Sequence, residues 1–522
     1  MSQSGSKGGL VQCVSLELPK PGLSDNRSHE ARLRDALTSV TGSRPSMPLY
    51  ALKKLGSVLP EAGYSIDSIL VQGPCGDEVA DVCPKFHHDP ILGMAVDLGS
   101  TTVVFYLVDM VEKRLLHTLS KYNPQAAHGE DILERILFAG RGNGLSILQR
   151  EVVQLFNDAA HELSSREGCT ANSIYFWTVA GNTTMTHFFL GLDPSHICKE
   201  PYLPSASRFD ILRPNEVGLV SNPGGRLYVF PNIGSYFGGD LIAAIIASGM
   251  HNSDAVSMLV DVGTNAEVIL GNKDWMVACA GAAGPALEGG ILSCGMRAQP
   301  GAIERVSIEP DTLEVHYKTI GGEPPKGLCG SAIIDLLAEM FTAGIVEQTG
   351  KLVKDRCPDR VVELNGELVF IVAKANETSH GQPVYISQSD IKNLIRSKGA
   401  MYTILNVVTQ SVGISFEDIE NFYVAGAFGN YIDPEKAITI GMLPDIPLER
   451  FKGLGNAAGK GALKLLLNKE LLFEIEKLCE RITYLEMNVR GDFMNQLTGA
   501  LFLPHTDWSR FPTVRKKLQP KA

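Results

Sequence analysis

The chain has 522 residues, and its 58 acidic side chains outnumber its 47 Lys and Arg side chains, for a formal net charge of −11. This balance excludes a nucleic-acid-binding surface or a polybasic membrane surface as the main feature of the protein. Hydrophobic residues make up 44% of the chain, enough for globular cores, and the length predicts about three or four structural units. The sequence lacks an apolar run of the roughly 18–20 residues that a membrane helix needs. The polar N-terminus predicts a cytoplasmic protein without a signal peptide.

Ten cysteines are scattered along the chain, and no two of them form a C-x-x-C pair. Neither zinc-finger nor ferredoxin spacing is present. Cysteines in such a pattern are typical of reduced, buried side chains. We therefore expect no iron–sulfur cluster in this chain.

Residues 1–10 are predicted to be a disordered tail, and residues 11–90 a small α/β domain that ends in a linker. The adjacent His87 and His88 lie in this linker, where a solvated segment is the first interpretation and a metal site the second. The domain's expected elements are a strand at Val11–Pro19, a helix capped by Ser24-Asp25 and running to Leu37, a helix at Met47–Leu59 and a strand at Ser68–Gly73.

A strand–turn–strand pattern follows the linker. The apolar run Leu92–Asp97 ends in a carboxylate, passes through Gly99, Ser100, Thr101 and Thr102, and continues as a second apolar run, Val103–Val108. This pattern predicts a β-hairpin whose tip carries hydroxyls and backbone N–H groups.

The same pattern returns a domain length further along the chain. Ser257–Asp261 leads into Gly263, Thr264 and Asn265, and Ala266–Leu270 follows. The repetition predicts two similar α/β halves, at about 91–250 and 251–505, that face each other across a cleft, with a basic tail at 506–522.

The remaining expected elements lie within and after these halves. The helices are Ile132–Phe138, Leu148–Leu163, Leu241–Met250, Ser331–Ala343, one from Ser389-Asp390 to about Gln410, and Gly459–Leu467. The strands are Ile174–Ala180, a pair near Val306–Tyr317, Asn421–Ala425, and one around Arg481–Glu486.

The two hairpin tips have the chemistry of a phosphate site. Glycine-rich turns present N–H groups to phosphate oxygens, and hydroxyls add donors. Asp97 and Asp261 suit such a site if Mg²⁺ lies between them and the β- and γ-phosphates, held largely through its own waters. The alternative is a pair of ordinary hairpins with turn-forming residues. The predicted phosphate-binding residues are Gly99, Ser100, Thr101, Thr102, Gly263, Thr264 and Asn265, with Asp97 and Asp261 at the metal.

An adenosine site is predicted at the segment Gly426, Ala427, Phe428 and Gly429, because small residues after a strand let the backbone approach a flat base. A simple strand-to-loop turn is the alternative. Asp240 is the first candidate for activating the attacking water, with a helix N-cap as its alternative role. Glu267 is the second candidate, with an exposed strand position as its alternative.

Two segments imitate nucleotide motifs. Gly455–Gly461 is one residue short of a P-loop and lacks the Ser or Thr that binds the metal. Gly140–Gly144 lacks dinucleotide-binding spacing and follows a predicted helix. We interpret neither as a site.

These motifs resemble the phosphate-1, phosphate-2 and adenosine motifs of the actin, sugar-kinase and heat-shock-chaperone ATPase superfamily. One branch is more similar: the ATP-dependent reductive activators of corrinoid proteins. The small domain resembles that family's middle domain. The segments that carry the resemblance are Leu16–Pro21, Asp25–Leu37, Ala180–Met185, Gly284–Gly290, Cys294–Ala298, Gly301–Ile303, Gln388–Ile391, Ala425–Pro444 and Gly455–Ala462.

The resemblance implies an α/β fold: a duplicated actin-like (ribonuclease H-like) ATPase domain preceded by a small α/β domain. It implies ATP and Mg²⁺ as cofactors. It also implies that a corrinoid protein or cobalamin-dependent methyltransferase is the partner, whose Co(II) is reduced to Co(I). Many such activators carry an iron–sulfur domain, and this chain has no such cysteine spacing, so we expect a separate electron donor. Analogy with the family predicts a homodimer. A small-molecule kinase of the same fold and a non-catalytic nucleotide-gated interaction module are the alternative functions.

Overall fold

The computed structural model describes residues 9–86, 88–129, 131–263, 265–282, 284, 292–487 and 493–519. The chain divides into two compact units, each of which is built from two separate stretches of sequence. Unit 1 contains residues 1–247 and 457–480, and unit 2 contains residues 248–456 and 481–522.

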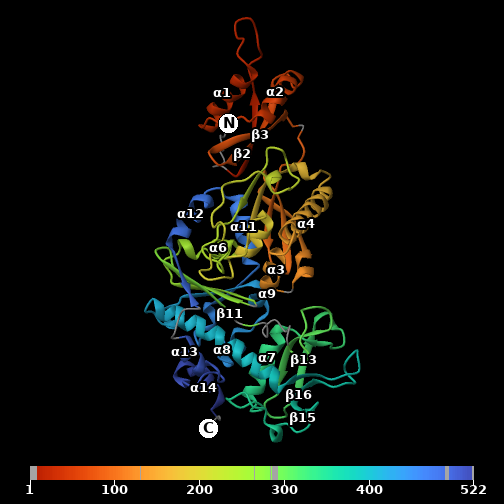
Figure 1. Ribbon diagram of the computed structural model, residues 1–522, viewed down its shortest axis with the longest axis vertical. Helices are drawn as coiled ribbons and strands as arrows, with labels where there is room; N and C mark the ends of the chain where they lie inside the picture. The colour runs from red at the N-terminus through yellow and green to blue at the C-terminus, as the bar shows by residue number, and fades with distance from the viewer. Residues whose placement is uncertain are drawn as a thin grey trace. The chain divides into compact units, whose positions relative to one another are not determined.

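Unit 1 begins with the small α/β domain, a three-stranded antiparallel sheet in the order β1-β2-β3 with two helices on one face (Figure 1). Leu33, Leu55 and Ile66 are among the residues of the core between the helices and the sheet. The elements are β1 (Val11–Glu17), α1 (His29–Thr41), α2 (Leu49–Glu61), β2 (Ser65–Gly73) and β3 (Gly76–Pro84).

Two expectations for this domain were wrong in detail. Leu10 is fully buried and its carbonyl accepts a hydrogen bond from Gln72, so the ordered chain begins before residue 11. Helix α1 is capped by Ser28 and not by Ser24-Asp25, because the Asp25 carboxylate instead binds Arg27 and Arg32.

The main sheet of unit 1 has five strands in the order β6-β5-β4-β7-β8. The first three strands are antiparallel, and β7 and β8 run parallel to β4. The strands are β4 (Leu92–Leu98), β5 (Thr102–Asp109), β6 (Arg114–Tyr122), β7 (Ile174–Gly181) and β8 (Arg226–Val229). The helices are α3 (Ile132–Ala139), α4 (Gly144–Arg166), α5 (Thr183–Leu190), α6 (Gly239–Ser248), α11 (Ala457–Leu467) and α12 (Leu471–Arg481).

Helix α11 returns to unit 1 from the C-terminal part of the sequence, where the sequence predicted one continuous second half. It crosses α6 closely: a Cβ atom at Gly461 would lie 1.9 Å from the Ala243 carbonyl oxygen. The hydroxyl of Thr178 on β7 donates a hydrogen bond to the carbonyl of Ala462, and Lys464 donates to the last carbonyls of α6. Gly461, the last glycine of the segment that imitates a P-loop, thus serves helix packing.

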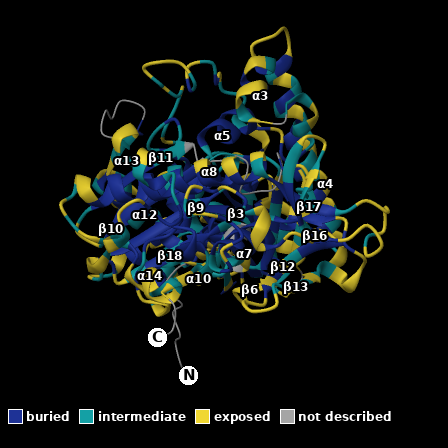
Figure 2. Cartoon of the chain, turned by 90° about the horizontal axis from the view of Figure 1, so that it is seen from below, coloured by how far each residue is buried: buried dark blue, intermediate teal, exposed yellow. Residues whose placement is uncertain are grey.

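The main sheet of unit 2 has six strands in the order β19-β18-β9-β10-β11-β20. Figure 2 shows β9 and β18 among the buried elements. Strands β9, β10 and β11 are antiparallel, and β18 and β19 run parallel to β9. The strands are β9 (Ser257–Val262), β10 (Asn265–Gly271), β11 (Met276–Ala282), β18 (Asn421–Ala425), β19 (Phe451–Gly455) and β20 (Ile482–Glu486).

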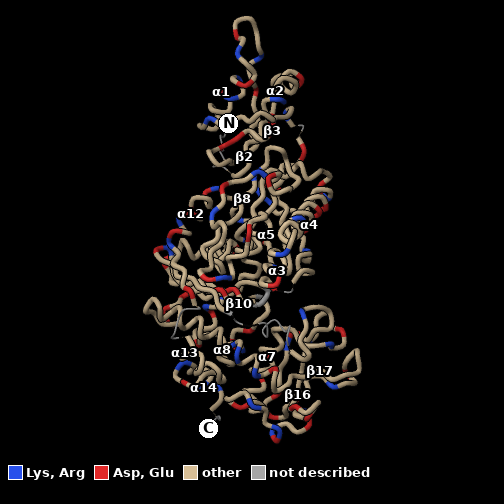
Figure 3. The backbone as a smooth tube through the Cα atoms, viewed as in Figure 1, with Lys and Arg blue, Asp and Glu red and all other residues tan. Residues whose placement is uncertain are grey.

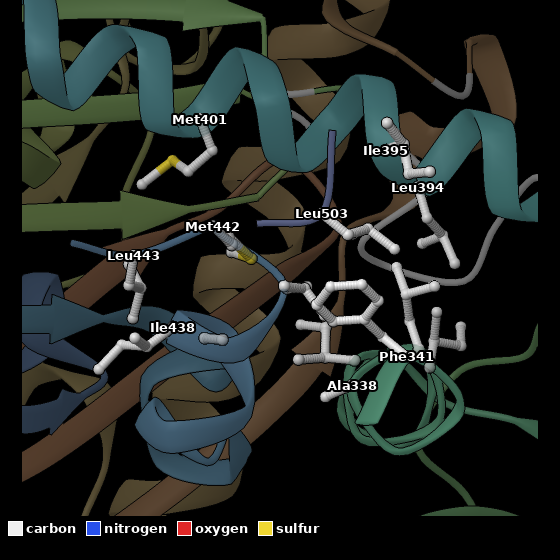
Figure 4. Packing of buried hydrophobic residues seen from close by; sticks show 14 of the residues in the cluster. Ala338, Phe341, Leu394, Ile395, Met401, Ile438, Met442, Leu443 and Leu503 are labelled. Carbon is white, nitrogen blue, oxygen red and sulfur yellow. The ribbon is translucent and has the colours of Figure 1, made fainter. Parts of the chain in front are cut away.

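Two small three-stranded sheets and several helices complete unit 2. Phe341 of α7, Leu394 and Ile395 of α8, and Leu503 lie together in its core (Figure 4). The remaining strands are β12 (Ala302–Ile308), β13 (Val315–Thr319), β14 (Gly327–Leu328), β15 (Val361–Leu364), β16 (Glu367–Ala373) and β17 (Val384–Ser387). The helices are α7 (Gly330–Thr342), α8 (Gln388–Ser411), α9 (Gly426–Tyr431), α10 (Pro434–Thr439), α13 (Phe493–Ala500) and α14 (Pro512–Leu518).

The two main sheets share one topology: an antiparallel three-strand meander whose first strand is extended by two parallel strands. Asp97 and Asp261 occupy the same place, the next-to-last residue of that first strand. The duplicated actin-like fold and the small α/β domain before it are therefore confirmed.

The C-terminal segment, expected as a basic tail from residue 506, is an ordered part of unit 2 as far as residue 519. Phe511 is fully buried, and α14 follows it. Lys398, buried inside α8, donates hydrogen bonds to the carbonyls of Phe502 and Pro504. His505 follows directly, and its Nδ1 accepts a hydrogen bond from the Asp507 N–H.

The buried His505 predicts a loss of stability in acid. Burial, with help from Arg510 and Lys398, lowers the pKa of His505 to about 4. The unfolded chain therefore takes up a proton near the ordinary histidine pKa, and the folded chain does not. The stabilisation is complete above the ordinary histidine pKa, and it is lost as the pH falls toward the folded-state pKa of about 4. Between about pH 7.5 and about pH 5 the free energy of unfolding should fall by about 2 kcal/mol more in the unmodified chain than in His505→Gln. Urea unfolding at both pH values measures this difference, and equal pH slopes would contradict the prediction.

Acidic and basic residues are interspersed along the backbone of both units (Figure 3). Within the described ranges, no helix combines the length and the apolarity that crossing a bilayer requires.

Candidate nucleotide site

The first hairpin turn joins β4 to β5 and is held tightly at Gly99. A Cβ atom on this residue would lie 2.4 Å from the carbonyl oxygen of Thr102, which is closer than real Cβ contacts come. Glycine is therefore required for the turn as it is folded. Ser100 and Thr101 are half-buried, and Thr102 is exposed.

Two buried side chains orient the backbone of this turn. Asn123 donates to the Gly99 carbonyl from its side chain (2.9 Å) and to the Thr101 carbonyl from its N–H (2.8 Å). Arg135 donates to the Ser100 carbonyl (2.6 Å). The C=O and N–H groups of a trans peptide point in opposite directions. The N–H groups that follow these three carbonyls along the turn therefore point away from Asn123 and Arg135. Such an array of N–H groups suits an anion such as phosphate.

Asp97 and Asp240 lie at the same edge of the unit 1 sheet. Asp97 pairs with Ala180 near the end of β7. Asn182 follows β7 and caps α5, and a Cβ atom at Gly238 would lie 2.4 Å from the Asn182 Cα. This contact brings the start of α6, with Asp240 in its first turn, to the carboxyl ends of the parallel strands.

The second hairpin has the corresponding arrangement in unit 2. Asp261 pairs with Glu267 on β10 and with Ala425 on β18. Directly paired residues project from the same face of a sheet, so the Asp261 and Glu267 carboxylates share one face. Thr264 lies outside the described residues, as does most of the Gly284–Gly290 motif, and only the backbone of Asn265 is described.

The predicted adenosine segment lies directly beside Asp261. Gly426 has a left-handed φ of 77°, and a Cβ atom there would lie 3.0 Å from Asp261 Oδ1. The segment begins helix α9, so the alternative interpretation, a simple strand-to-loop turn, was wrong. Gly429 allows this helix to pack on β18, because its Cβ would lie 2.2 Å from the Val424 carbonyl oxygen. The side chains of Ala427 and Phe428 lie outside the described part of the segment.

Burial raises the pKa of the Asp261 carboxyl to about 6, although a backbone hydrogen bond from Val262 lowers it in part. A cation beside a buried carboxylate offsets the cost of keeping it charged. Carboxylate oxygens are also the ligands that Mg²⁺ prefers. The residues at this strand end therefore fit a hard divalent cation.

Gly426→Ala should weaken nucleotide binding by about 10-fold or more, because the added methyl group presses on Asp261 and displaces it. The left-handed conformation adds a separate stability cost of about 1–2 kcal/mol for alanine. Gly413→Ala is the matched control, since Gly413 has a φ of +71° and open space around its Cβ. Calorimetric titration with Mg-ATP measures both variants. Equal affinities in the two variants would rule out a role for Gly426 at the site.

Sequence reasoning missed Asn123 and Arg135. Both are fully buried, and both act through backbone carbonyls, which leave no sequence motif. The only available signal for Asn123 was its place before Pro124, which is typical of a helix cap; it does cap a short 3₁₀ helix.

Comparisons with known proteins cover nearly the whole chain. Residues 9–89 match the RACo linker region, residues 92–253 the RACo middle region, and residues 255–515 the C-terminal domain of RACo, the ASKHA domain. The expectation that the small domain is the family's middle domain was therefore wrong: it is the linker region, and the middle region begins at residue 92.

Individual relatives agree with this assignment. The corrinoid activation enzyme RamQ of Eubacterium limosum is 33% identical over 446 residues, which cover 84% of this chain and 74% of RamQ. A [Co(II) methylated amine-specific corrinoid protein] reductase of Methanosarcina barkeri is 24% identical, over 75% of this chain and 73% of that protein. A solved structure of a reductive activator for a corrinoid, iron–sulfur protein is 38% identical, with a TM-score of 0.87, and the match covers 98% of this chain and 82% of that one. The chain thus belongs to the RACo family of reductive activators of corrinoid proteins.

Proposed function

We propose that this protein uses ATP to restore a corrinoid protein, or a cobalamin-dependent methyltransferase, by promoting the reduction of its Co(II) to Co(I). The observation that carries the proposal is the pair of equivalent aspartates, at the same position of two equivalent sheets, in a member of this family. The relatives, a corrinoid activation enzyme and a reductase of a Co(II) corrinoid protein, support the same choice of partner.

The two hairpins would bind one Mg-ATP. In this proposal Asp97 and Asp261 hold Mg²⁺ through its waters, and the turns at Gly99 and Gly263 hold the phosphates. Gly426 and the start of α9 form the adenosine side. Asp240 or Glu267 orients the attacking water.

The electron comes from outside this chain in our proposal. Each activation adds one electron to Co(II), and ATP hydrolysis to ADP and phosphate supplies the driving force. A separate ferredoxin or flavoprotein would be the physiological donor. Nucleotide binding and hydrolysis would act by shifting a two-state complex with the corrinoid partner.

An anaerobic spectroscopic assay tests the proposal. A candidate corrinoid protein in the Co(II) state is mixed with this chain, a low-potential chemical reductant and Mg-ATP. Conversion to Co(I) should require both the chain and ATP, and a non-hydrolysable ATP analogue should not sustain it. Phosphorylation of a small-molecule acceptor would identify a kinase instead. Nucleotide binding without partner-stimulated hydrolysis would identify a gated interaction module.

A further inference from the structure

We infer that Cys13, Asp67 and His88 form a Zn²⁺ site in the small domain that ties the linker to its sheet. The sulfur, the carboxylate and an imidazole nitrogen of these residues all lie within 4.8 Å of one another. The three residues come from β1, from β2 and from the linker after β3.

The sheet places the first two ligands on one face. Cys13 pairs with Ile69, and Ser15 pairs with Asp67. Side chains alternate along a strand, so Cys13 and Asp67 project from the same side. The opposite face of this sheet packs under α1 and α2, through residues such as Leu16 and Ile66. The ligand cluster is therefore separate from the domain's apolar core.

Asp67 is held in one orientation. Its side chain is 2% exposed. The Ser15 hydroxyl donates to Oδ1 (2.5 Å), and the Phe86 N–H donates to Oδ2 (2.8 Å). Hydrogen bonds of this kind orient the carboxylate ligands of metal sites. The Phe86 bond also returns the linker to the sheet just before His88.

The tautomer of His88 suits a metal ligand. Its Nδ1 lies 2.9 Å from the Asp89 carbonyl oxygen, which can only accept, so Nδ1 carries the proton. In the neutral ring the lone pair is then on Nε2, and Nε2 lies 3.7 Å from Asp67 Oδ2. That distance is too long for a hydrogen bond. It is close to the roughly 3.3–3.6 Å that separates two ligands of one tetrahedral Zn²⁺ with bonds of about 2.0–2.3 Å.

The donor set selects the metal. A thiolate and an imidazole favour Zn²⁺ over Mg²⁺ or Ca²⁺, which prefer oxygen ligands. Three protein ligands leave one tetrahedral position for water. Since the ligands come from three separated segments, a bound ion would fix the linker against β1 and β2 and stabilise the folded domain.

Zinc binding to the full-length, untagged chain tests the site. After removal of metals, competition titration with a chromophoric chelator should show one Zn²⁺ per chain. Cys13→Ala and His88→Gln should each bind about 100-fold more weakly or worse, since even residues behind the ligands contribute 10–100-fold in known sites. Cys75→Ala and His161→Gln, which replace exposed residues outside the cluster, should bind as the unmodified chain does. Circular dichroism checks that all four variants fold.

Co²⁺ in place of Zn²⁺ gives a second readout. A thiolate-to-cobalt absorption band should appear in the unmodified chain and in Cys75→Ala, and should be missing in Cys13→Ala. The proposal is overturned if the unmodified chain binds no Zn²⁺ more tightly than Cys13→Ala does, or if the Co²⁺ complex has no thiolate band. Either result would leave His88 and Asp67 as neighbouring side chains beside a free thiol.

Discussion

Asp97→Asn and Asp261→Asn should each lower ATP turnover by roughly 100-fold or more, while the chain stays folded. Asparagine keeps the size of aspartate but removes the charge that would hold Mg²⁺. Both positions are half-buried strand ends, and their sheets are held by apolar neighbours such as Val96 and Val260. Steady-state hydrolysis at saturating Mg-ATP measures the loss.

Asp109→Asn is the control for this experiment. Asp109 lies at the opposite end of the same hairpin, where it pairs with Leu92 and accepts hydrogen bonds from two turn N–H groups. Its replacement should leave turnover within about twofold of the unmodified chain. If both Asp97→Asn and Asp261→Asn retain full activity, the metal assignment is wrong.

Glu78→Gln should destabilise unit 1 by about 3 kcal/mol, because it leaves a buried arginine without its counter-ion. Glu78 on β3 forms an ion pair with Arg226 on β8, whose side chain is 2% exposed. Arg213 and the Tyr50 hydroxyl bind the same carboxylate oxygen. Close packing surrounds the pair: a Cβ atom at Gly224 would lie 2.5 Å from the Ala80 carbonyl oxygen. These contacts join the small domain to the edge of the main sheet.

Glu162→Gln provides the comparison for Glu78→Gln. Glu162 also binds two cations, Lys121 and Arg166, but its side chain is 38% exposed. Exposed pairs contribute at most about 1 kcal/mol. Guanidinium unfolding followed by circular dichroism should therefore separate the two variants clearly. Equal denaturation midpoints for the two variants would show that the ion pair between Glu78 and Arg226 does not stabilise unit 1.

The sequence predicted the two equivalent hairpins, because their signals are local. Asp97 and Asp261 each lie near the end of an apolar strand that leads into a turn containing glycine, and that pattern depends only on neighbouring residues. The structure places both at the same position of equivalent sheets. Strands β3, β6, β8, β11 and β19 were among those missed. Strand β6 (RLLHTLSKY) is a partly exposed edge strand without clean alternation, so it lacks the apolar face that identifies a strand.

A local capping box and a tertiary contact account for two other differences. Ser387, and not Ser389, caps α8. Asp390 is the third residue of the helix, and its carboxylate accepts a hydrogen bond from the Ser387 N–H, while the Ser387 hydroxyl accepts one from the Asp390 N–H. Helix α11 joins unit 1 through the close approach of Gly461 to α6. Pairing of this kind between segments that are distant in sequence has no local signature.

A crystal structure with Mn²⁺ and a non-hydrolysable ATP analogue tests the central claim most directly. Anomalous scattering locates the manganese independently of the nucleotide. We predict one nucleotide per chain, with one Mn²⁺ at its phosphates and the carboxylates of Asp97 and Asp261 both within about 5 Å of the metal, the reach of a water-bridged ligand. A nucleotide bound at only one of the two hairpins, or at neither, would contradict the account.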